Sequence, residues 1–219
     1  MDRRTYRYGF QLLLALLTAV VLTGSGCVSG LATIMYLAGQ DKTPAEYAGL
    51  KNKKVAVVCR SMSSLQYRDA RAAKDLAVAV GRLLELNGTK ITVIPPQKVE
   101  KWADENTWDE FPEIGKAVGA QMVIGIDLEH FDIYEGQTLY QGKANVSVNV
   151  YDCENNDKLV FEKTLPQVVW PPNSCVPTSD RQAAQFRREF LRVLADRVGR
   201  HFYAFDPRLD YAQDAVAGL

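Results

Sequence analysis

KANVSVNV, the stretch from residue 143 to residue 150, decides the fold of this chain. Its even positions are all apolar and its odd positions are all polar. Because successive side chains of a strand point to opposite faces, the pattern predicts a strand with one buried and one solvated face. We therefore expect Val148 to face the core and Ser147 to face water. A strand of this kind belongs to an antiparallel sheet with a cover over its apolar face.

Two neighbouring strands complete a three-stranded antiparallel meander. Apolar residues occupy even positions over 122–128 but odd positions over 131–133. A slip of one residue inverts the facing of a strand, so this change predicts a β-bulge near residues 129 and 130. Downstream, the polar run 152–157 predicts a hairpin loop, and Leu159 begins the return strand.

The segments on either side of the meander predict an α/β domain around a mixed sheet, with the element order β-α-β-α-α-β-β-β-α. The initial strand-helix-strand order implies parallel pairing. Helices are predicted from apolar residues three and four apart and from their caps. The expected elements are a buried strand at 55–59, a helix at 66–87, a strand at 91–94, short helices at 96–103 and 111–118, the meander, a proline-rich loop at 166–177 and a long C-terminal helix ending near 205.

The first 27 residues have the layout of a secretory signal. Three arginines precede an uncharged apolar run over 9–22, and small residues then lead into Cys27. A cysteine in this place resembles a bacterial lipobox, which implies cleavage and acylation at Cys27. An uncleaved signal anchor is the alternative, because the uncharged stretch continues beyond Cys27 as far as Gln40.

These features divide the chain into four parts. Residues 1–27 are expected to be a lipoprotein-type signal peptide, 28–52 a membrane-proximal tether, 53–206 the α/β domain and 207–219 a tail. The signal holds three of the 26 basic side chains and one of the 26 acidic ones, so the rest of the chain is slightly acidic. A slightly acidic domain lacks the basic field that nucleic-acid binding needs.

The chain contains no nucleotide-binding loop, dinucleotide fingerprint or nucleophile elbow. One acidic cluster with a histidine, formed by Asp127, Glu129, His130 and Asp132, has the donor types for a divalent cation. Strand alternation divides this cluster between two faces, which favours a solvated strand end over a metal site. The bulge could instead turn His130 toward the carboxylates, because bulges re-aim side chains. The other histidine, His201, is expected to pack at the boundary of the core. We therefore predict no enzyme activity, metal or cofactor.

The last helix is rich in arginine. These side chains could bind anionic lipid or the acidic surface of a partner, but Glu189 and Asp196 are interleaved with them, and this pattern favours a solvated face. The arginines are Arg181, Arg187, Arg188, Arg192, Arg197 and Arg200.

The cysteines after the signal fall into two settings. Cys59 lies in the predicted central strand and is expected to be a reduced core thiol. Cys153 and Cys175 lie in two loops, and an exported domain allows them to form a disulfide. The sequence leaves that pairing open.

Three segments of the domain carry a family resemblance: KVAVV at 54–58, GAQMVIGIDL at 119–128 and ANVSVNVYD at 144–152. Together they resemble the envelope domain shared by the curli-secretion lipoprotein, the lipoprotein activators of penicillin-binding proteins and the amino-terminal domain of TolB. The resemblance covers roughly residues 53–205. It implies an exported α/β domain, often on a lipid anchor, that docks onto other envelope proteins, and it transfers no catalytic residue.

These observations together predict a lipid-anchored, non-enzymatic protein of the bacterial cell envelope, exported to the periplasmic side. We expect it to act through protein contacts, as an accessory factor in cell-wall or appendage assembly. Its partners would be the lipid bilayer and other envelope proteins, without nucleic acid. A small-ligand-binding or metal-dependent enzyme domain on an uncleaved anchor is the alternative, and the choice between inner and outer membrane stays open.

Overall fold

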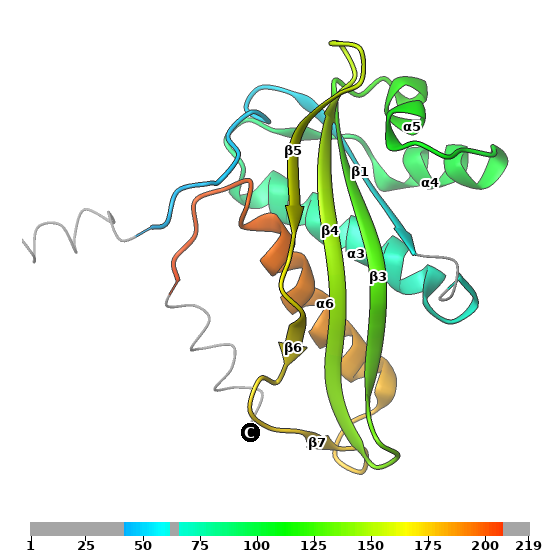
Figure 1. Ribbon diagram of the computed structural model, residues 1–219, viewed down its shortest axis with the longest axis vertical. Helices are drawn as coiled ribbons and strands as arrows, with labels where there is room; N and C mark the ends of the chain where they lie inside the picture. The colour runs from blue at the N-terminus through cyan, green and yellow to red at the C-terminus, as the bar shows by residue number, and fades with distance from the viewer. Residues whose placement is uncertain (1–41, 62–65, 208–219) are drawn as a thin grey trace, which may run out of the picture. The chain divides into compact units, whose positions relative to one another are not determined.

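The computed structural model of this chain describes residues 42–61 and 66–207, without the side chains of residues 66–70 (Figure 1). Cys27, the predicted signal and the tail after Pro207 lie outside these residues. Residues 43–61 and 66–207 form one compact unit. In the described part of the chain, no helix has both the length and the apolar character needed to cross a membrane.

A mixed sheet with the strand order β2-β1-β3-β4-β5 forms the centre of this unit (Figure 1). β1 (Lys54–Ser61) pairs in parallel with β2 (Thr92–Val93) and β3 (Met122–Glu135). β3 pairs antiparallel with β4 (Leu139–Asp152), and β4 pairs antiparallel with β5 (Lys158–Thr164). The predicted α/β fold, with its parallel start and antiparallel meander, is therefore confirmed.

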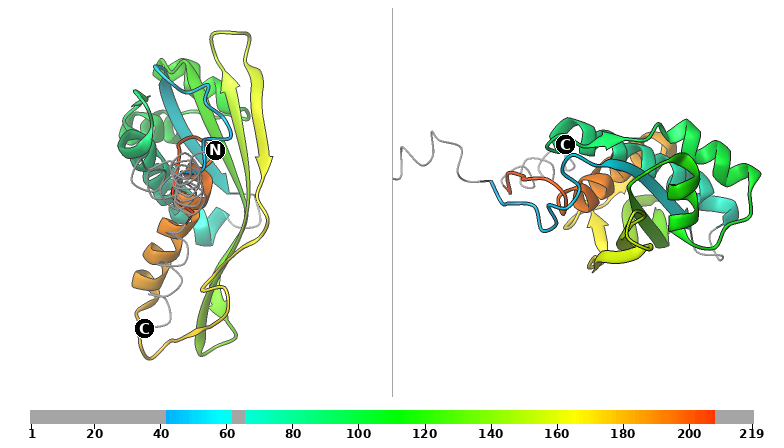
Figure 2. Two further views of the ribbon diagram at one scale, coloured as in Figure 1. Left: turned by 90° about the vertical axis from the view of Figure 1, so that its left-hand side faces the viewer. Right: turned by 90° about the horizontal axis from the view of Figure 1, so that it is seen from above.

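Four helices of the described residues cover the sheet. α3 (Gln66–Asn87) joins β1 to β2, and α4 (Pro96–Glu105) and α5 (Phe111–Val118) join β2 to β3. The long C-terminal helix α6 (Ala183–Gly199) lies beside α3 behind the sheet of Figure 1, and Figure 2 shows it running along the β3–β4 hairpin. Each helix turns an apolar stripe toward the sheet, which is the usual source of helix stability in a small domain.

Alternate residues of the central strand β1 face two separate cores. Val55 and Val57 join the larger core under α3 and α6. Ala56 and Val58 join a smaller core that Val99 of α4 and the side chains of α5 complete. Both faces of β1 are thus buried, as its continuous apolar run predicts.

Residues 143–150 have the alternating burial that their sequence predicts. Ala144, Val146, Val148 and Val150 are all completely buried, whereas Ser147 is only half-buried. The predicted bulge is also present, because the register between β3 and β4 shifts between residues 128 and 130.

The proline-rich segment 166–177 is not only a loop, as we predicted from its composition. It contains β6 (Val168–Trp170) and β7 (Val176–Pro177), and both pair antiparallel with β4. β3 pairs with one edge of β4 along its length, but on the other edge β5 covers only the second half, so the backbone groups of the first half would otherwise lack partners on that edge. Two short strands supply those partners despite the prolines around them.

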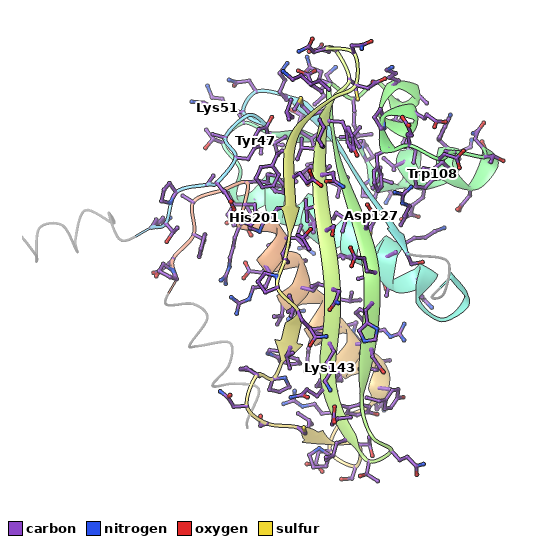
Figure 3. The ribbon with its side chains drawn as sticks, viewed as in Figure 1. Tyr47, Lys51, Trp108, Asp127, Lys143 and His201 are labelled. Carbon is purple, nitrogen blue, oxygen red and sulfur yellow. The ribbon has the colours of Figure 1, made fainter. Side chains whose placement is uncertain are left out.

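Residues 43–52, predicted from their polar composition as part of a tether, instead belong to the folded unit. Thr43 and Phe205 exchange two backbone hydrogen bonds of 2.8 and 3.0 Å, and the Tyr47 N–H donates to the His201 carbonyl at 2.8 Å. Leu50 is only 1% exposed. Figure 3 shows Tyr47 and His201 close together at this point. The domain therefore begins about ten residues earlier than its composition indicates.

Candidate functional site

The acidic cluster lies on one face of the sheet, contrary to the division that strand alternation predicts. Because of the β-bulge, the side chains of Glu129 and His130 both lie on the exposed face of the sheet. Asp127, before the bulge, and Asp132, after it, lie on the same face. Figure 3 shows Asp127 on the face of the sheet that α3 and α6 do not cover. The premise of two faces was therefore wrong, because the bulge restores a common direction.

Sharing a face does not make these residues a metal centre, because each carboxylate has its own partner. Asp127 Oδ1 accepts from Arg60 Nε at 2.6 Å, and Glu129 accepts from the Ser147 hydroxyl at 2.8 Å. Asp132 accepts from the backbone N–H groups of the next two residues. Within residues 42–61 and 66–207, no three His, Cys, Asp or Glu side chains converge as metal ligands would.

The three cysteines of the described chain are free thiols, so the disulfide that the sequence left open does not form. Cys153 follows the end of β4, whereas Cys175 adjoins Val176, which pairs with the start of β4. Fourteen residues of strand separate the two sites by roughly 40 Å, and a disulfide needs Cα atoms within about 7 Å. Burial raises the pKa of the Cys59 thiol and raises that of Cys153 to about 11, so both stay protonated and unreactive at neutral pH.

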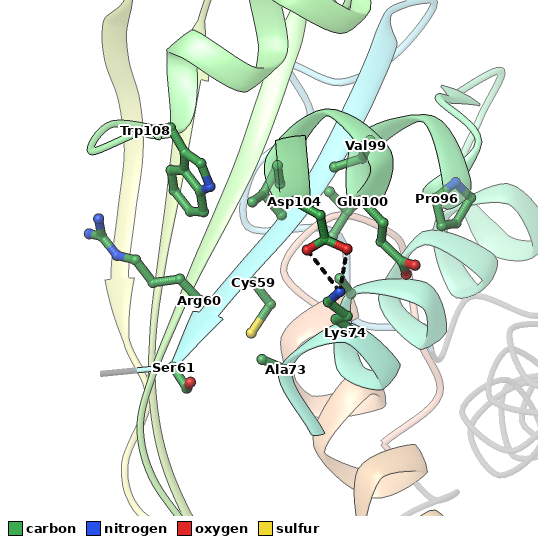
Figure 4. Close-up of a pocket in the computed structure, with 14 residues that line it drawn as sticks. Cys59, Arg60, Ser61, Ala73, Lys74, Pro96, Val99, Glu100, Asp104 and Trp108 are labelled. Carbon is green, nitrogen blue, oxygen red and sulfur yellow. Dashed lines mark hydrogen bonds and ion pairs between the residues drawn. The ribbon is translucent and has the colours of Figure 1, made fainter. Parts of the chain in front are cut away.

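A crevice of about 320 Å³ opens at the carboxyl end of β1, between α3 and α4 (Figure 4). β1 leads into α3 on one face of the sheet and β2 leads into α4 on the other. Crevices at such a switch point are common ligand sites in α/β sheets. Small side chains on the two helices, Ala73, Ala77 and Ala103, leave the space.

Three of the four charged side chains that line this crevice are paired, and the fourth, Glu100, forms no ion pair with a described residue. Lys74 Nζ donates to both carboxylate oxygens of Asp104, at 3.0 and 2.9 Å, across the space between the two helices (Figure 4). Arg60 is held by Asp127, by the Asp109 carbonyl at 2.8 Å and by the face of the Phe111 ring, 4.7 Å from its centroid. The crevice is therefore an apolar space with two ion pairs and one further carboxylate beside it.

A second opening, of about 680 Å³, lies between α3 and α6 on their side away from the sheet, and we call it the helix groove. Seven residues of α3 and four of α6 line it, each set spaced by three or four residues so that it forms one helical stripe. The lining residues are Arg71, Asp75, Val78, Ala79, Arg82, Leu83, Leu86, Arg188, Leu191, Arg192 and Ala195.

The floor of the helix groove is apolar and partly in contact with water. Leu191 is buried at its base, but Val78 is 40% exposed and Leu86 is 70% exposed. These are two of the four large apolar side chains that are exposed in the described chain; Leu159, 42% exposed on β5, is another. α3 therefore carries a second apolar stripe, besides the one that packs on the sheet, and no element among the described residues covers it.

The rim of the helix groove is basic, with four arginines and one aspartate.

The arginines of the last helix differ in whether they form ion pairs. Glu189 pairs with Arg181 at 2.7 Å and Asp196 pairs with Arg200 at 2.5 Å, so both interleaved acids are occupied. Arg188 and Arg192 remain on the rim, exposed, and no described residue forms an ion pair with either.

His201, the second histidine considered in the sequence, lies away from both openings. His201 sits at the boundary of the core, as expected, against the rings of Phe161 and Phe202, and its Nδ1 lies 2.6 Å from a carboxylate oxygen of Glu46. The side of α3 that lines the helix groove went unnoticed in the sequence. Its signal was present as the apolar residues Val78 and Leu86, in addition to those that pack on the core.

No protein-family model matches this chain, and no curated protein matches it at a significant score. Among solved structures it is similar to a single-residue variant of the PelC dodecamer from Paraburkholderia phytofirmans, with 13% identity and a TM-score of 0.45, over 74% of this chain and 96% of that one. It is also similar to the lipoprotein GNA1162 from Neisseria meningitidis (12%, 0.39, 66% and 96%) and to the LpoB C-terminal domain from Salmonella enterica (14%, 0.37, 54% and 83%). Bacterial lipoproteins, the group that the sequence resemblance names, are thus among the structures similar to this chain. At these identities and scores, the function must be argued from this chain's own residues.

Proposed function

We propose that this chain is a lipid-anchored, non-enzymatic protein of the bacterial cell envelope whose exported α/β domain works by binding another protein. The anchor is the acyl group on Cys27, which the basic, apolar and small segments before that cysteine predict. The second protein belongs to the envelope and takes part in cell-wall or appendage assembly, as the family resemblance implies.

The helix groove is the observation that carries this proposal. Its floor leaves Val78 and Leu86 in water, although the other apolar side chains described for the same helix are buried or partly buried. Covering a large apolar side chain stabilises a complex by on the order of 1 to 2 kcal/mol, so a partner that fills this groove gains affinity from each.

Capture from cells tests the docking half of the proposal. A tagged full-length chain is crosslinked in living cells, and the proteins recovered with wild type are compared with those recovered with Leu86→Asp. Leu159→Asp is the matched control, because Leu159 is also an exposed apolar side chain but lies on β5. We expect one protein to be lost with Leu86→Asp and retained with Leu159→Asp. Recovery that is the same for all three chains would refute docking through the groove.

Labelling with an alkyne fatty acid tests the anchor. Wild type should incorporate the label and Cys27→Ala should not, because the acyl groups attach to that cysteine. Equal labelling, or a mature protein that keeps its first arginines, would replace the lipid anchor with an uncleaved signal anchor.

Small-ligand binding is the second candidate, favoured by the position of the crevice at the switch point of the sheet. A ligand that binds only the folded chain raises its melting temperature in proportion to occupancy. A saturable rise with a small molecule, abolished by Ala77→Leu in the wall of the crevice, would favour this candidate over docking alone.

A further inference from the structure

We infer that the segment which binds the helix groove is an acidic, amphipathic α-helix of the partner protein. This inference rests on the proposed docking function and adds the chemistry and the shape of the partner. It follows from the charge of the rim, from the secondary structure of the walls and from the depth of the floor.

Charge selects an acidic partner. Arg71, Arg82, Arg188 and Arg192 surround the groove, and Asp75 is the one acidic side chain among its lining residues. No described residue forms an ion pair with any of these four arginines, so they offer their guanidinium groups to a ligand. An arginine fork pairs with a carboxylate through two parallel hydrogen bonds, which lysine cannot do.

The walls select a helix. Both are α-helices whose backbone groups are already bonded within the helix, so the groove has no strand edge to which an extended peptide could pair. A ligand must therefore bind through its side chains, and a helix presents apolar side chains at three- and four-residue spacing on one face. From Arg71 to Leu86 the groove follows α3 for about 22 Å, which corresponds to roughly four turns of a bound helix.

The depth of the groove favours a protein segment over a membrane surface. Leu191, at the base of the groove, is only 4% exposed and lies between two helices, where a flat bilayer surface does not reach. A helix that inserts its own apolar side chains reaches both the floor and the arginine rim. Anionic vesicles are nevertheless a necessary arm of the test, because arginines also attract anionic lipid.

Binding of a model peptide tests the inference. The probe is a fluorescein-labelled synthetic peptide of about 16 residues, with leucines on one helical face and glutamates on both flanks. One control peptide has the same composition in scrambled order, and the other has lysine in place of every glutamate. Fluorescence anisotropy is measured with the full-length chain in detergent micelles. We expect saturable binding of the acidic amphipathic peptide alone, weakened by added salt.

Two protein variants locate the binding site. Arg188→Glu combined with Arg192→Glu should weaken binding of the acidic peptide by about tenfold or more, because both rim charges become repulsive. Lys101→Glu reverses an exposed charge on α4, away from the groove, and should leave binding unchanged. The altered arginines are exposed, so both variants should keep the melting temperature of wild type.

The inference would be overturned if the scrambled peptide bound as well as the acidic amphipathic peptide, or if the double variant bound that peptide as well as wild type does. It would also be overturned if the peptide did not bind, while vesicles with a high content of anionic lipid bound in a way that depends on Arg188 and Arg192. The proposed function fails separately. If Leu86→Asp loses a captured protein but Arg188→Glu with Arg192→Glu retains it, the groove docks a protein that is not acidic. If wild type captures no protein, docking itself fails.

Discussion

Glu46 Oε2 lies 2.6 Å from Nδ1 of His201, and the other carboxylate oxygen of Glu46 lies 2.7 Å from Nζ of Lys163. One side chain thus joins the first residues of the folded unit to the end of α6 and to β5. Together with the backbone bonds of Thr43 and Tyr47, this contact forms what we call the N-terminal clasp, residues 43–47. The clasp ties the domain directly to the part of the chain that leads to the predicted anchor.

Removing the charge of Glu46 should loosen the clasp without unfolding the domain. The carboxylate is 45% exposed, and exposed ion pairs contribute less than about 1 kcal/mol, so Glu46→Gln should cost no more than that. Hydrogen exchange at neutral pH should accelerate at the amides of Thr43 and Tyr47, by up to about fivefold. Asp104→Asn, which removes the exposed pair with Lys74, is the control and should leave these two amides unchanged.

The contribution of Glu46 should also depend on pH. Hydrogen bonds from Lys163 and then from His201 hold the pKa of Glu46 below its ordinary value of 4.5. A carboxyl whose pKa is lower in the folded chain stabilises the fold above its unfolded pKa, and this stabilisation is lost as the pH falls through the folded pKa. In urea unfolding, the stability that wild type has over Glu46→Gln should therefore be present above pH about 4.5 and be lost as the pH falls through the folded pKa of Glu46. A difference that stays undiminished at the most acidic pH at which the chain still folds would contradict this assignment.

The register of β4 gives a third prediction. Val148 is completely buried, so Val148→Ala should lower the free energy of unfolding by about 1 to 3 kcal/mol through lost burial and a residual cavity. Ser147, on the opposite face, bonds Glu129 and Thr164 at the surface. Ser147→Ala should therefore cost well under 1 kcal/mol. Denaturant titrations that gave equal costs, or the reverse order, would show that the register is wrong.

The free thiols give a fourth prediction. Cys153 and Cys175 lie at opposite ends of β4, so an unreduced chain should contain both as thiols. Alkylation of the denatured, unreduced protein followed by mass spectrometry should modify both residues, and Cys59 with them. A peptide pair linked through Cys153 and Cys175 would contradict the arrangement of β4, β5 and β7.

Local pattern was enough to predict the strands and helices, because each carries its period within a few residues. The parity change after residue 128 located the bulge correctly, but it left open whether the bulge turns His130 toward the carboxylates of the acidic cluster. Parity counting assigns Asp127 and Asp132 to opposite faces, whereas an extra residue at the bulge returns them to one face. β6 and β7 are too short, at three and two residues, to show any period at all.

Contacts between distant segments could not be predicted in this way. Tyr47 and Leu50 are isolated apolar residues in a polar segment, and only the fold brings them against Phe161, Phe202 and the core. The helix groove has the same origin. Its two stripes are separated by about a hundred residues of sequence, so the apolar side chains of α3 and the arginines of α6 meet only because the two helices pack side by side.

The central claim, that the helix groove docks another protein, is tested most directly by photo-crosslinking in cells. A benzophenone amino acid replaces Leu86 in the full-length chain, and in a second strain it replaces Leu159 on β5. Irradiation should join the chain to one other protein from position 86 and leave position 159 without that adduct. No adduct from position 86, or the same adduct from both positions, would contradict the claim.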